Sequence, residues 1–387
     1  MVSIYRRPEL AAQMVRPLLN PGVLDEGLRS GLFLSGLRRT GKTTFLLNDL
    51  IPALEEAGAL VVYVDLWSDT QTNPAVLVLV AVRKTLVELQ TPASSILGKL
   101  KRVGGADLGA FGFKFGFKLE SVGTEGGPTL AQALTEVVDQ AKTNVVLIVD
   151  EVQHAITADD GNQMLLALKS ARDAINPRPG TPGHFIFIGT GSHRALVSEL
   201  TARRNQAFAG ATSVPYPVLG GDYVGHLLKR LALEGAVALP SLEVATQAFA
   251  TLGSRPEEML KALRQLGRHL PPGANPDEHL PVIAATLRST AADVELMKVE
   301  QLGGLATAIF ERIASTDGDA RGLFSGEAAA DYTKALGREV RVEEIQRATN
   351  DLLAANLIMR RGHGMYGVTD PFVQEIWREK KALEDKD

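Results

Sequence analysis

The sequence predicts an α/β fold: a parallel sheet with helices on its faces, followed by a helical region and a small C-terminal domain. Three observations support this prediction. Short apolar runs alternate with segments of helical spacing in the first half of the chain, a glycine-rich loop follows the first run, and another run ends in two adjacent acids. Alternating strands and helices are typical of a parallel sheet, because parallel neighbours need a crossover helix between them.

Composition places the chain among ordinary globular proteins. It has 387 residues, enough for two or three domains, with 45% apolar and 22% charged residues. No apolar run reaches the roughly 18 residues of a membrane span, and the start, MVSIYRRPEL, lacks the apolar core of a signal peptide. Cysteine is absent and the net charge is −4, so we expect no disulfide and no general attraction to nucleic acid. These features favour a soluble cytoplasmic protein without membrane contact.

The loop GLRRTGKT (residues 36–43) fits the phosphate-binding pattern G-x-x-x-x-G-K-[ST]. The apolar run GLFLS before it predicts a strand, and TTFLLNDLIPALEEAG (43–58) predicts a helix, so the order is strand, loop, helix. Backbone N–H groups of such a loop turn toward phosphates at a helix N-terminus. We expect Lys42 to reach the β- and γ-phosphates and Thr43 to hold Mg²⁺. The loop residues expected at the nucleotide are Gly36, Leu37, Arg38, Arg39, Thr40, Gly41, Lys42, Thr43 and Thr44.

The run NVVLIVDEVQ (144–153) predicts a buried strand that ends in Asp150 and Glu151. Asp150 suits a magnesium ligand, directly or through water, and Glu151 suits the base that activates the attacking water. The alternative is a helix cap, because acids often start helices. A glutamate beside the aspartate favours hydrolysis of the nucleotide over nucleotide binding alone. The chain has no N-K-x-D sequence for reading guanine, so ATP is favoured over GTP.

Two further runs predict strands of the same sheet, ALVVYVDLW (59–67) and HFIFIGTGS (184–192). We expect the strand before the loop to lie beside the acidic strand, with the polar end of 184–192 facing the γ-phosphate. Thr190, or with less support Ser192, is a candidate to sense the phosphate or hold the water. The alternative for either hydroxyl is a turn-forming role. The run PAVLVLVAV (74–82) predicts a buried helix.

RRTGKT, VLIVDEVQ and the C-terminal segment MYGVTDPFVQEIW together resemble the archaeal-type ATPases of the AAA+ and STAND group, relatives of the origin-recognition initiators. The resemblance implies ATP and Mg²⁺ as ligands. It also implies an ATPase core in residues 1–218 with an inserted strand near 104–127, a helical lid in 219–290 and a winged helix in 296–387.

The resemblance extends to single residues. IYRRPEL (4–10) is similar to a family stretch beside the adenine, which places Tyr5 and Arg6 at the base; Glu9 and Leu10 also match. LGSRPEEML (252–260) resembles the second sensor, so Arg255 is expected to reach the γ-phosphate. The alternative for Arg255 is a surface position before a helix.

The sequence departs from the family at RRNQAFAGAT (203–212), where no arginine follows Phe208. Arg203 or Arg204 could act on a neighbour's ATP or form a solvated pair, so assembly into a ring stays open. Arg38 or Arg39 is expected to meet an acid of the lid or the C-terminal domain.

The stretch FGFKFGFK (111–118) alternates strictly and predicts an inserted strand that covers a core or docks a partner through its edge. Phenylalanines and lysines on opposite faces do not form one platform, which argues against stacking on nucleic acid.

Three segments of helical spacing between 301 and 356, then LIMRRGHGMYGV (357–368) as two short strands, predict the winged helix, and LPPGANPDEHLP (270–281) predicts a linker. From Leu296 to Asp387 the chain has 13 Lys and Arg against 16 Asp and Glu, a net charge of −3. The predicted recognition helix carries Glu343, Glu344 and Asp351 against Arg347, and an acidic helix opposes contact with phosphates. Only the wing, with Arg360, Arg361 and His363, is basic.

We therefore expect an ATPase that acts as a nucleotide-driven switch for a partner protein or for self-association. The rival hypothesis is a DNA-associated ATPase, in the manner of an initiator or a transposition regulator. A third, a scaffold that binds ATP without hydrolysis, is disfavoured by Glu151. The histidines lack ligand spacing, so no metal other than Mg²⁺ is expected.

Overall fold

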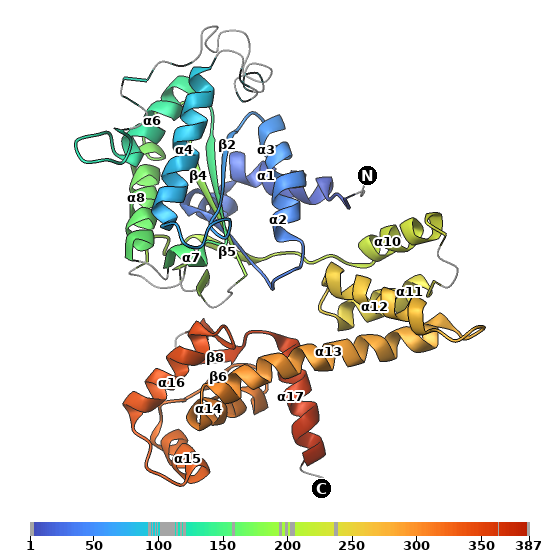
Figure 1. Ribbon diagram of the computed structural model, residues 1–387. Helices are drawn as coiled ribbons and strands as arrows, with labels where there is room; N and C mark the ends of the chain where they lie inside the picture. The colour runs from blue at the N-terminus through green and yellow to red at the C-terminus, as the bar shows by residue number, and fades with distance from the viewer. Residues whose placement is uncertain are drawn as a thin grey trace. The chain divides into compact units, whose positions relative to one another are not determined.

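The structure is a computed structural model that describes residues 4–91, 121–156, 159–192, 206–235, 239–362 and 364–384, together with residues 94, 96, 98, 100, 113, 115–116, 118, 196–197 and 200–201. These residues form two compact units (Figure 1). The first contains residues 1–36 and 42–216, and the second contains residues 37–41 and 217–387. Each unit is described by itself below.

The first unit contains a five-stranded parallel sheet in the order β2-β3-β4-β1-β5. Its strands are β1 (Leu32–Ser35), β2 (Leu60–Asp65), β3 (Val145–Asp150), β4 (Phe185–Gly191) and β5 (Thr212–Pro215). The first four lie within the runs that predicted strands. The α/β fold with a phosphate loop, as predicted, is confirmed.

The predicted order of these strands is wrong in one respect. We expected β1 beside the acidic strand β3, but β4 pairs with both and lies between them. Register joins Leu34 to Thr190 on one side and Val149 to Gly189 on the other. The polar end of β4 is therefore flanked by the phosphate loop and by the acids. Strands that pair across more than a hundred residues of sequence leave no local pattern, so the sequence could not predict this order.

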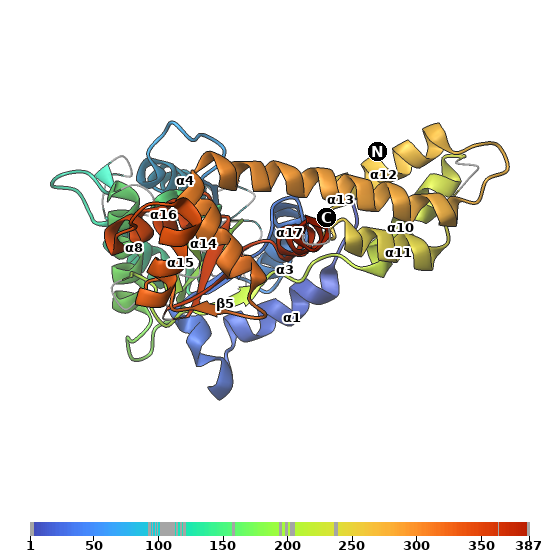
Figure 2. The same ribbon diagram turned by 90° about the horizontal axis from the view of Figure 1, so that it is seen from below.

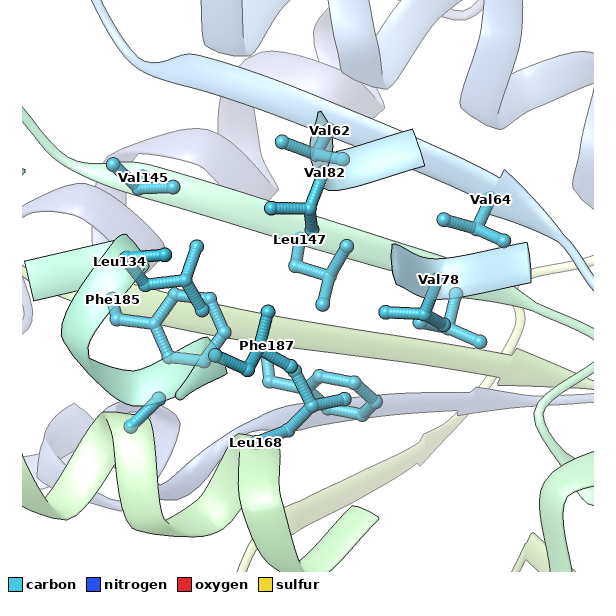
Figure 3. Packing of buried hydrophobic residues seen from close by; sticks show 14 of the residues in the cluster. Val62, Val64, Val78, Val82, Leu134, Val145, Leu147, Leu168, Phe185 and Phe187 are labelled. Atoms are coloured by element: carbon cyan, nitrogen blue, oxygen red, sulfur yellow. The ribbon is translucent and has the colours of Figure 1, made fainter. Parts of the chain in front are cut away.

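Helices cover both faces of the sheet (Figure 1). On one face lie α4 (Pro74–Gln90), α6 (Leu130–Ala141) and α8 (Asp159–Ile175), and on the other α1 (Pro8–Leu19) and the helical segment after the phosphate loop. Alternate residues of β3 serve the two faces, because side chains of a strand point to opposite sides. Leu147 packs with Val78 and Val82 of α4 on one face (Figure 3), and Ile148 packs on the other.

The helix predicted for 74–82 forms, but it is not buried all round. Val78 and Val82 are buried in α4, whereas Val76 and Val80 are about half exposed. The helix lies on the surface of a three-layer unit, so only one side of it reaches the sheet.

The helical segment after the loop has three parts, α2 (Lys42–Phe45), the π-helical turn η2 (Leu46–Leu50) and α3 (Ile51–Glu56). Pro52 lies at the start of α3 and has no N–H to give to the carbonyl of Asn48, four residues before. The guanidinium of Arg6 donates to that carbonyl instead. A proline in the helix thus leaves an acceptor that the N-terminal segment uses.

The helical part of the second unit consists of α10 (Gly221–Leu233), α11 (Leu242–Thr251), α12 (Pro256–His269) and α13 (Pro276–Gln301). They share an apolar core that includes Phe249, Met259 and Leu280. The linker predicted for 270–281 is shorter than expected, because α13 begins at Pro276 and contains Pro281. This helix is continuous to Gln301 (Figures 1 and 2) and therefore runs across the boundary predicted between 290 and 296.

The C-terminal part follows the order helix, strand, helix, helix, strand, strand, which is the order of elements in a winged helix. Its elements are α14 (Gly304–Ser315), β6 (Ala320–Arg321), α15 (Gly326–Leu336), α16 (Val342–Ala354), β7 (Ile358–Gly362), β8 (Met365–Val368) and a closing helix α17 (Pro371–Glu384). The strands pair antiparallel in the order β6-β8-β7. The two-residue strand β6 was not predicted, since it is too short to show a period.

Part of the predicted inserted strand FGFKFGFK lies outside the described residues. Of that stretch the structure describes Phe113, Phe115, Gly116 and Lys118, none of them in a strand. Phe113 is buried and Phe115 packs against the same core, while Lys118 is exposed, so these two phenylalanines cover the core. Arg203, Arg204 and His363 also lie outside the described residues. No helix in the described part of the chain is both long enough and apolar enough to cross a membrane.

Candidate nucleotide-binding site

The phosphate loop joins β1 to α2 through a tight turn. Arg39 and Gly41 both have positive φ, 64° and 90°, and Thr40 donates its hydroxyl to Leu37 O at 2.9 Å. Lys42 is buried, and its Nζ donates to Gly36 O at 2.9 Å, which brings the ammonium back over the first residue of the loop. The loop therefore has the closed turn and the inward lysine that phosphate binding requires.

Asp150 ends β3 as a buried carboxylate that accepts four hydrogen bonds. Oδ2 accepts from Thr43 Oγ1 at 2.7 Å and from Tyr63 Oη at 3.3 Å. Oδ1 accepts from the hydroxyl of Thr190 and from Glu151 N at 3.1 Å. Burial, followed by the charge of Asp150, raises the pKa of Tyr63, so the phenol stays a neutral donor. The loop, β2 and β4 thus meet on one carboxylate.

Glu151 follows directly and adopts a left-handed backbone with φ 54°, a conformation that costs about 1 kcal/mol or more for a residue with a side chain. Its Oε2 accepts from Ser192 Oγ at 2.7 Å, from Ser192 N at 3.2 Å and from Gln153 Nε2. Burial alone would raise the pKa of Glu151, but the hydrogen bonds from Gln153 and Ser192, with the charge of Lys42, hold it below its usual value. Glu151 is therefore a carboxylate at neutral pH.

The hydroxyl of Thr43 fits a magnesium ligand. Its hydrogen is donated to Asp150, so the lone pairs of Thr43 Oγ1 remain for a cation, and Asp150 supplies negative charge beside them. Hydroxyl and carboxylate oxygens are the ligands that Mg²⁺ prefers. Among the described residues no cluster of three or more histidines and acids could hold a metal ion by itself.

The N-terminal segment is attached to the helix after the loop. Asp49, with its side chain 1% exposed, accepts from Arg6 Nε at 2.8 Å and from Arg7 N at 3.0 Å. Arg7 also donates to Tyr216 Oη at 3.2 Å and lies over the rings of Phe45 and Tyr216. Arg6 is thus held by Asp49. Tyr5 of the same segment is partly exposed.

Arg39 and Arg255, which the sequence also proposed for roles at the site, both lie beside acidic residues of the second unit. Arg39 lies 3.4 Å from Glu257 and 3.9 Å from Glu258, in the first turn of α12. Arg255, the residue before α12, donates to Asp370 at 2.7 Å, just before α17. Asp370 also accepts from Phe372 N at 3.0 Å.

Sequence reasoning missed four residues of this region: Tyr63, Asp49, Gln153 and Tyr216. Only Asp49 left a signal, as a single acid in an otherwise apolar helix, LLNDLI. Tyr63 lies among the apolar residues of β2, and Gln153 begins the short helix α7 (Gln153–Ile156) two residues after Glu151. Their roles depend on contacts that the sequence does not show.

Comparison with known proteins agrees with the fold described above. Residues 26–197 match the family model described as AAA domain. The Walker-type ATPase PABY2304 of Pyrococcus abyssi aligns over 97% of this chain and 96% of its own, with a TM-score of 0.56 and 16% identity. The ADP form of the ORC2 protein of Aeropyrum pernix aligns over 98% and 96%, with a TM-score of 0.51 and 12% identity. A search of curated proteins gave no match.

The match to the AAA domain model covers fewer than half of the residues of the chain. The part of the chain that matches this model contains the phosphate loop, the strand β3 that ends in Asp150, and β4. The two solved structures share the fold over almost the whole chain.

Proposed function

We propose that the protein binds Mg²⁺ and ATP at the phosphate loop and hydrolyses the ATP. The observation that carries this proposal is the contact of 2.7 Å between Thr43 Oγ1 and Asp150 Oδ2. It joins the loop to the acidic strand at the carboxyl end of the sheet, where open α/β sheets bind their ligands. Lys42 on one side and Glu151 on the other complete the set of groups that phosphoryl transfer needs.

Each of these residues has a role in the proposal. Lys42 binds the β- and γ-phosphates, and the N–H groups of residues 37–44 surround them. Thr43 and Asp150 hold Mg²⁺, which supplies positive charge to the transferred phosphoryl group when it is bound. Glu151 accepts the proton of the attacking water, and its lowered pKa keeps it deprotonated for that task. Thr190 is placed by its hydrogen bond to Asp150.

We further propose that the nucleotide drives a conformational switch for a partner protein. Two contacts support this. Residues 37–41 of the phosphate loop belong to the second unit, where Arg39 pairs with Glu257. In the same unit, Arg255 before α12 pairs with Asp370 before α17. A change at the loop can therefore pass to α12 and on to the C-terminal elements. The cytoplasmic location stays a prediction.

The nucleotide site is tested by two substitutions. Lys42→Ala should abolish ATP binding in a calorimeter, because the ammonium that faces the phosphates is lost. Glu151→Gln should keep binding while the rate of hydrolysis falls about 10²- to 10⁴-fold, the contribution of a general base. Lys169→Ala is a matched control, since that lysine lies on α8 and pairs with Asp173. ATP affinity that survives Lys42→Ala would overturn the site assignment.

The second candidate function is a DNA-associated ATPase. The order of elements in residues 304–368 favours it, because winged helices often bind duplex DNA. Charge opposes it: the part from Leu296 onward has a net charge of −3. Arg361 also lies 3.4 Å from Asp319, and Arg360 lies over the ring of Tyr366, so both wing arginines have contacts within the protein.

A further inference from the structure

The carboxylate of Glu151 is bonded unevenly. Its Oε2 accepts three hydrogen bonds, two from Ser192 and one from Gln153. Its Oε1 accepts none from any residue that the structure describes. A carboxylate with one saturated oxygen and one open oxygen has a fixed orientation and a single site for a proton.

We propose that Gln153, together with Ser192, is a positioning residue that holds Glu151 so that Oε1 accepts the proton of the attacking water. This inference rests on the proposed role of Glu151 as the base. In this proposal Gln153 acts through Glu151 and not on the water or the nucleotide directly. Ser192, which the sequence offered as a candidate phosphate sensor, is assigned here to the same task.

The surroundings of Gln153 determine which way its amide faces. The side chain is 4% exposed, and its Nε2 lies against Glu151 Oε2 and 3.4 Å from Ser192 Oγ. The opposite orientation would bring the amide oxygen against the carboxylate, which is repulsive, so the N–H groups must face Glu151. The amide oxygen of Gln153 is buried and has no hydrogen-bond partner within the described residues.

Gly191 gives the amide its space. A Cβ at this position would lie 2.5 Å from Gln153 Oε1, closer than a Cβ atom comes to a neighbouring atom in a protein. The glycine at the end of β4 therefore allows Gln153 to reach across from α7 to the group of Glu151 and Ser192.

The network compensates for the backbone of Glu151. The backbone of Glu151 is left-handed, with φ 54°, and is therefore strained. Without hydrogen-bond partners, its side chain would also move among several rotamers. Three hydrogen bonds to a charged oxygen restrict it to one. Orientation of a catalytic group contributes to rate because a misplaced base rarely meets its proton. Removing these hydrogen bonds should therefore lower the rate of the chemical step and leave the affinity for the nucleotide unchanged.

The main test is Gln153→Met, which keeps the length of the side chain and removes its donor. We expect kcat for ATP to fall about ten- to a hundredfold, as for the loss of a hydrogen bond to a charged group, with the dissociation constant for ATP unchanged. Ser192→Ala, which keeps the backbone N–H, should give a smaller fall, and Ser192→Thr should restore most of the rate. The Ser192 variants keep the proposal testable if Gln153→Met does not fold.

Gln140→Met is a matched control. Gln140 Nε2 also donates to a glutamate, Glu136 Oε1 at 2.9 Å on α6, but that pair lies outside the site. Its substitution should leave kcat unchanged.

A double-mutant cycle with Glu151→Gln separates positioning from a general structural role. If Gln153 acts through Glu151, Gln153→Met should lower the rate in the wild-type background and change nothing further in the Glu151→Gln background. Equal losses in both backgrounds, or no loss in the wild type, overturn the inference. If Glu151→Gln itself leaves hydrolysis unchanged, the proposed function of Glu151 is wrong and the inference falls with it. A failure of Gln153→Met alone leaves the proposed function intact.

Discussion

At the scale of single residues, the acceptor oxygens of the site have identified hydrogen-bond donors. Asp150, 1% exposed, has hydrogen-bond partners in a buried place because two hydroxyls, a phenol and a backbone N–H all donate to it. Burying a carboxylate without such partners costs several kcal/mol. The sequence identified the acid and two of its donors, Thr43 and Thr190, but it did not show that all three meet.

Thr190→Val tests this arrangement. The valine keeps the shape of the side chain and removes one donor from a buried charge, so we expect the free energy of unfolding to fall by about 1.5–3 kcal/mol. Urea unfolding without nucleotide measures the loss. Thr190→Ser should restore most of it. Stability equal to the wild type would show that the hydroxyl of Thr190 is not needed to satisfy Asp150.

At the scale of elements, two arginine–carboxylate pairs attach α17 to the helices before it. Arg255 pairs with Asp370, with side chains 23% and 18% exposed, and Arg288 of α13 pairs with Glu375 and lies over the ring of Phe372. The N-terminus of α17 is therefore held by both α12 and α13. A movement of α12 would be passed on to α17.

A cycle of Arg255→Ala and Asp370→Asn measures the first pair. Asparagine keeps the helix cap of α17, so the cycle isolates the charge interaction, and we expect a coupling of about 1 kcal/mol in unfolding experiments. The exposed pair of Lys298 and Glu295 is the control and should show less coupling. Additive effects of the two substitutions would mean that the contact contributes nothing.

The same variants examine the sensor role that the resemblance implies for Arg255. If Arg255 reaches the γ-phosphate, Arg255→Ala should lower ATP hydrolysis more than Asp370→Asn does, although both break the pair. Equal effects on hydrolysis would restrict Arg255 to the contact with α17.

At the scale of the whole molecule, the net charge of the C-terminal part predicts which of the two proposed functions a DNA-binding experiment should support. An acidic C-terminal part in which Arg360 and Arg361 have contacts within the protein offers few contacts to phosphates. We therefore expect no specific binding to duplex DNA at about 150 mM salt, with or without ATP, because phosphate contacts dominate such affinity. Fluorescence anisotropy at several salt concentrations measures it. Salt-dependent binding that Arg360→Ala and Arg361→Ala abolish would support the DNA-associated ATPase instead.

The sequence by itself determined the features that depend on neighbouring residues. These are the strand, loop and helix around Lys42, the four main strands of the sheet, and the acids at 150 and 151, because apolar runs and glycine turns act locally. It also predicted the helices of the C-terminal part, since their spacing is regular.

Only the tertiary structure decided what joins distant segments. It placed β4 between β1 and β3, joined Arg6 to Asp49, and brought Gln153 and Ser192 to one oxygen of Glu151. Such contacts depend on the order of the strands in the sheet and on the packing of side chains. More than one strand order is compatible with the same pattern of apolar runs. The sequence therefore named the candidate catalytic groups, while the fold determined which residues hold each of them in place.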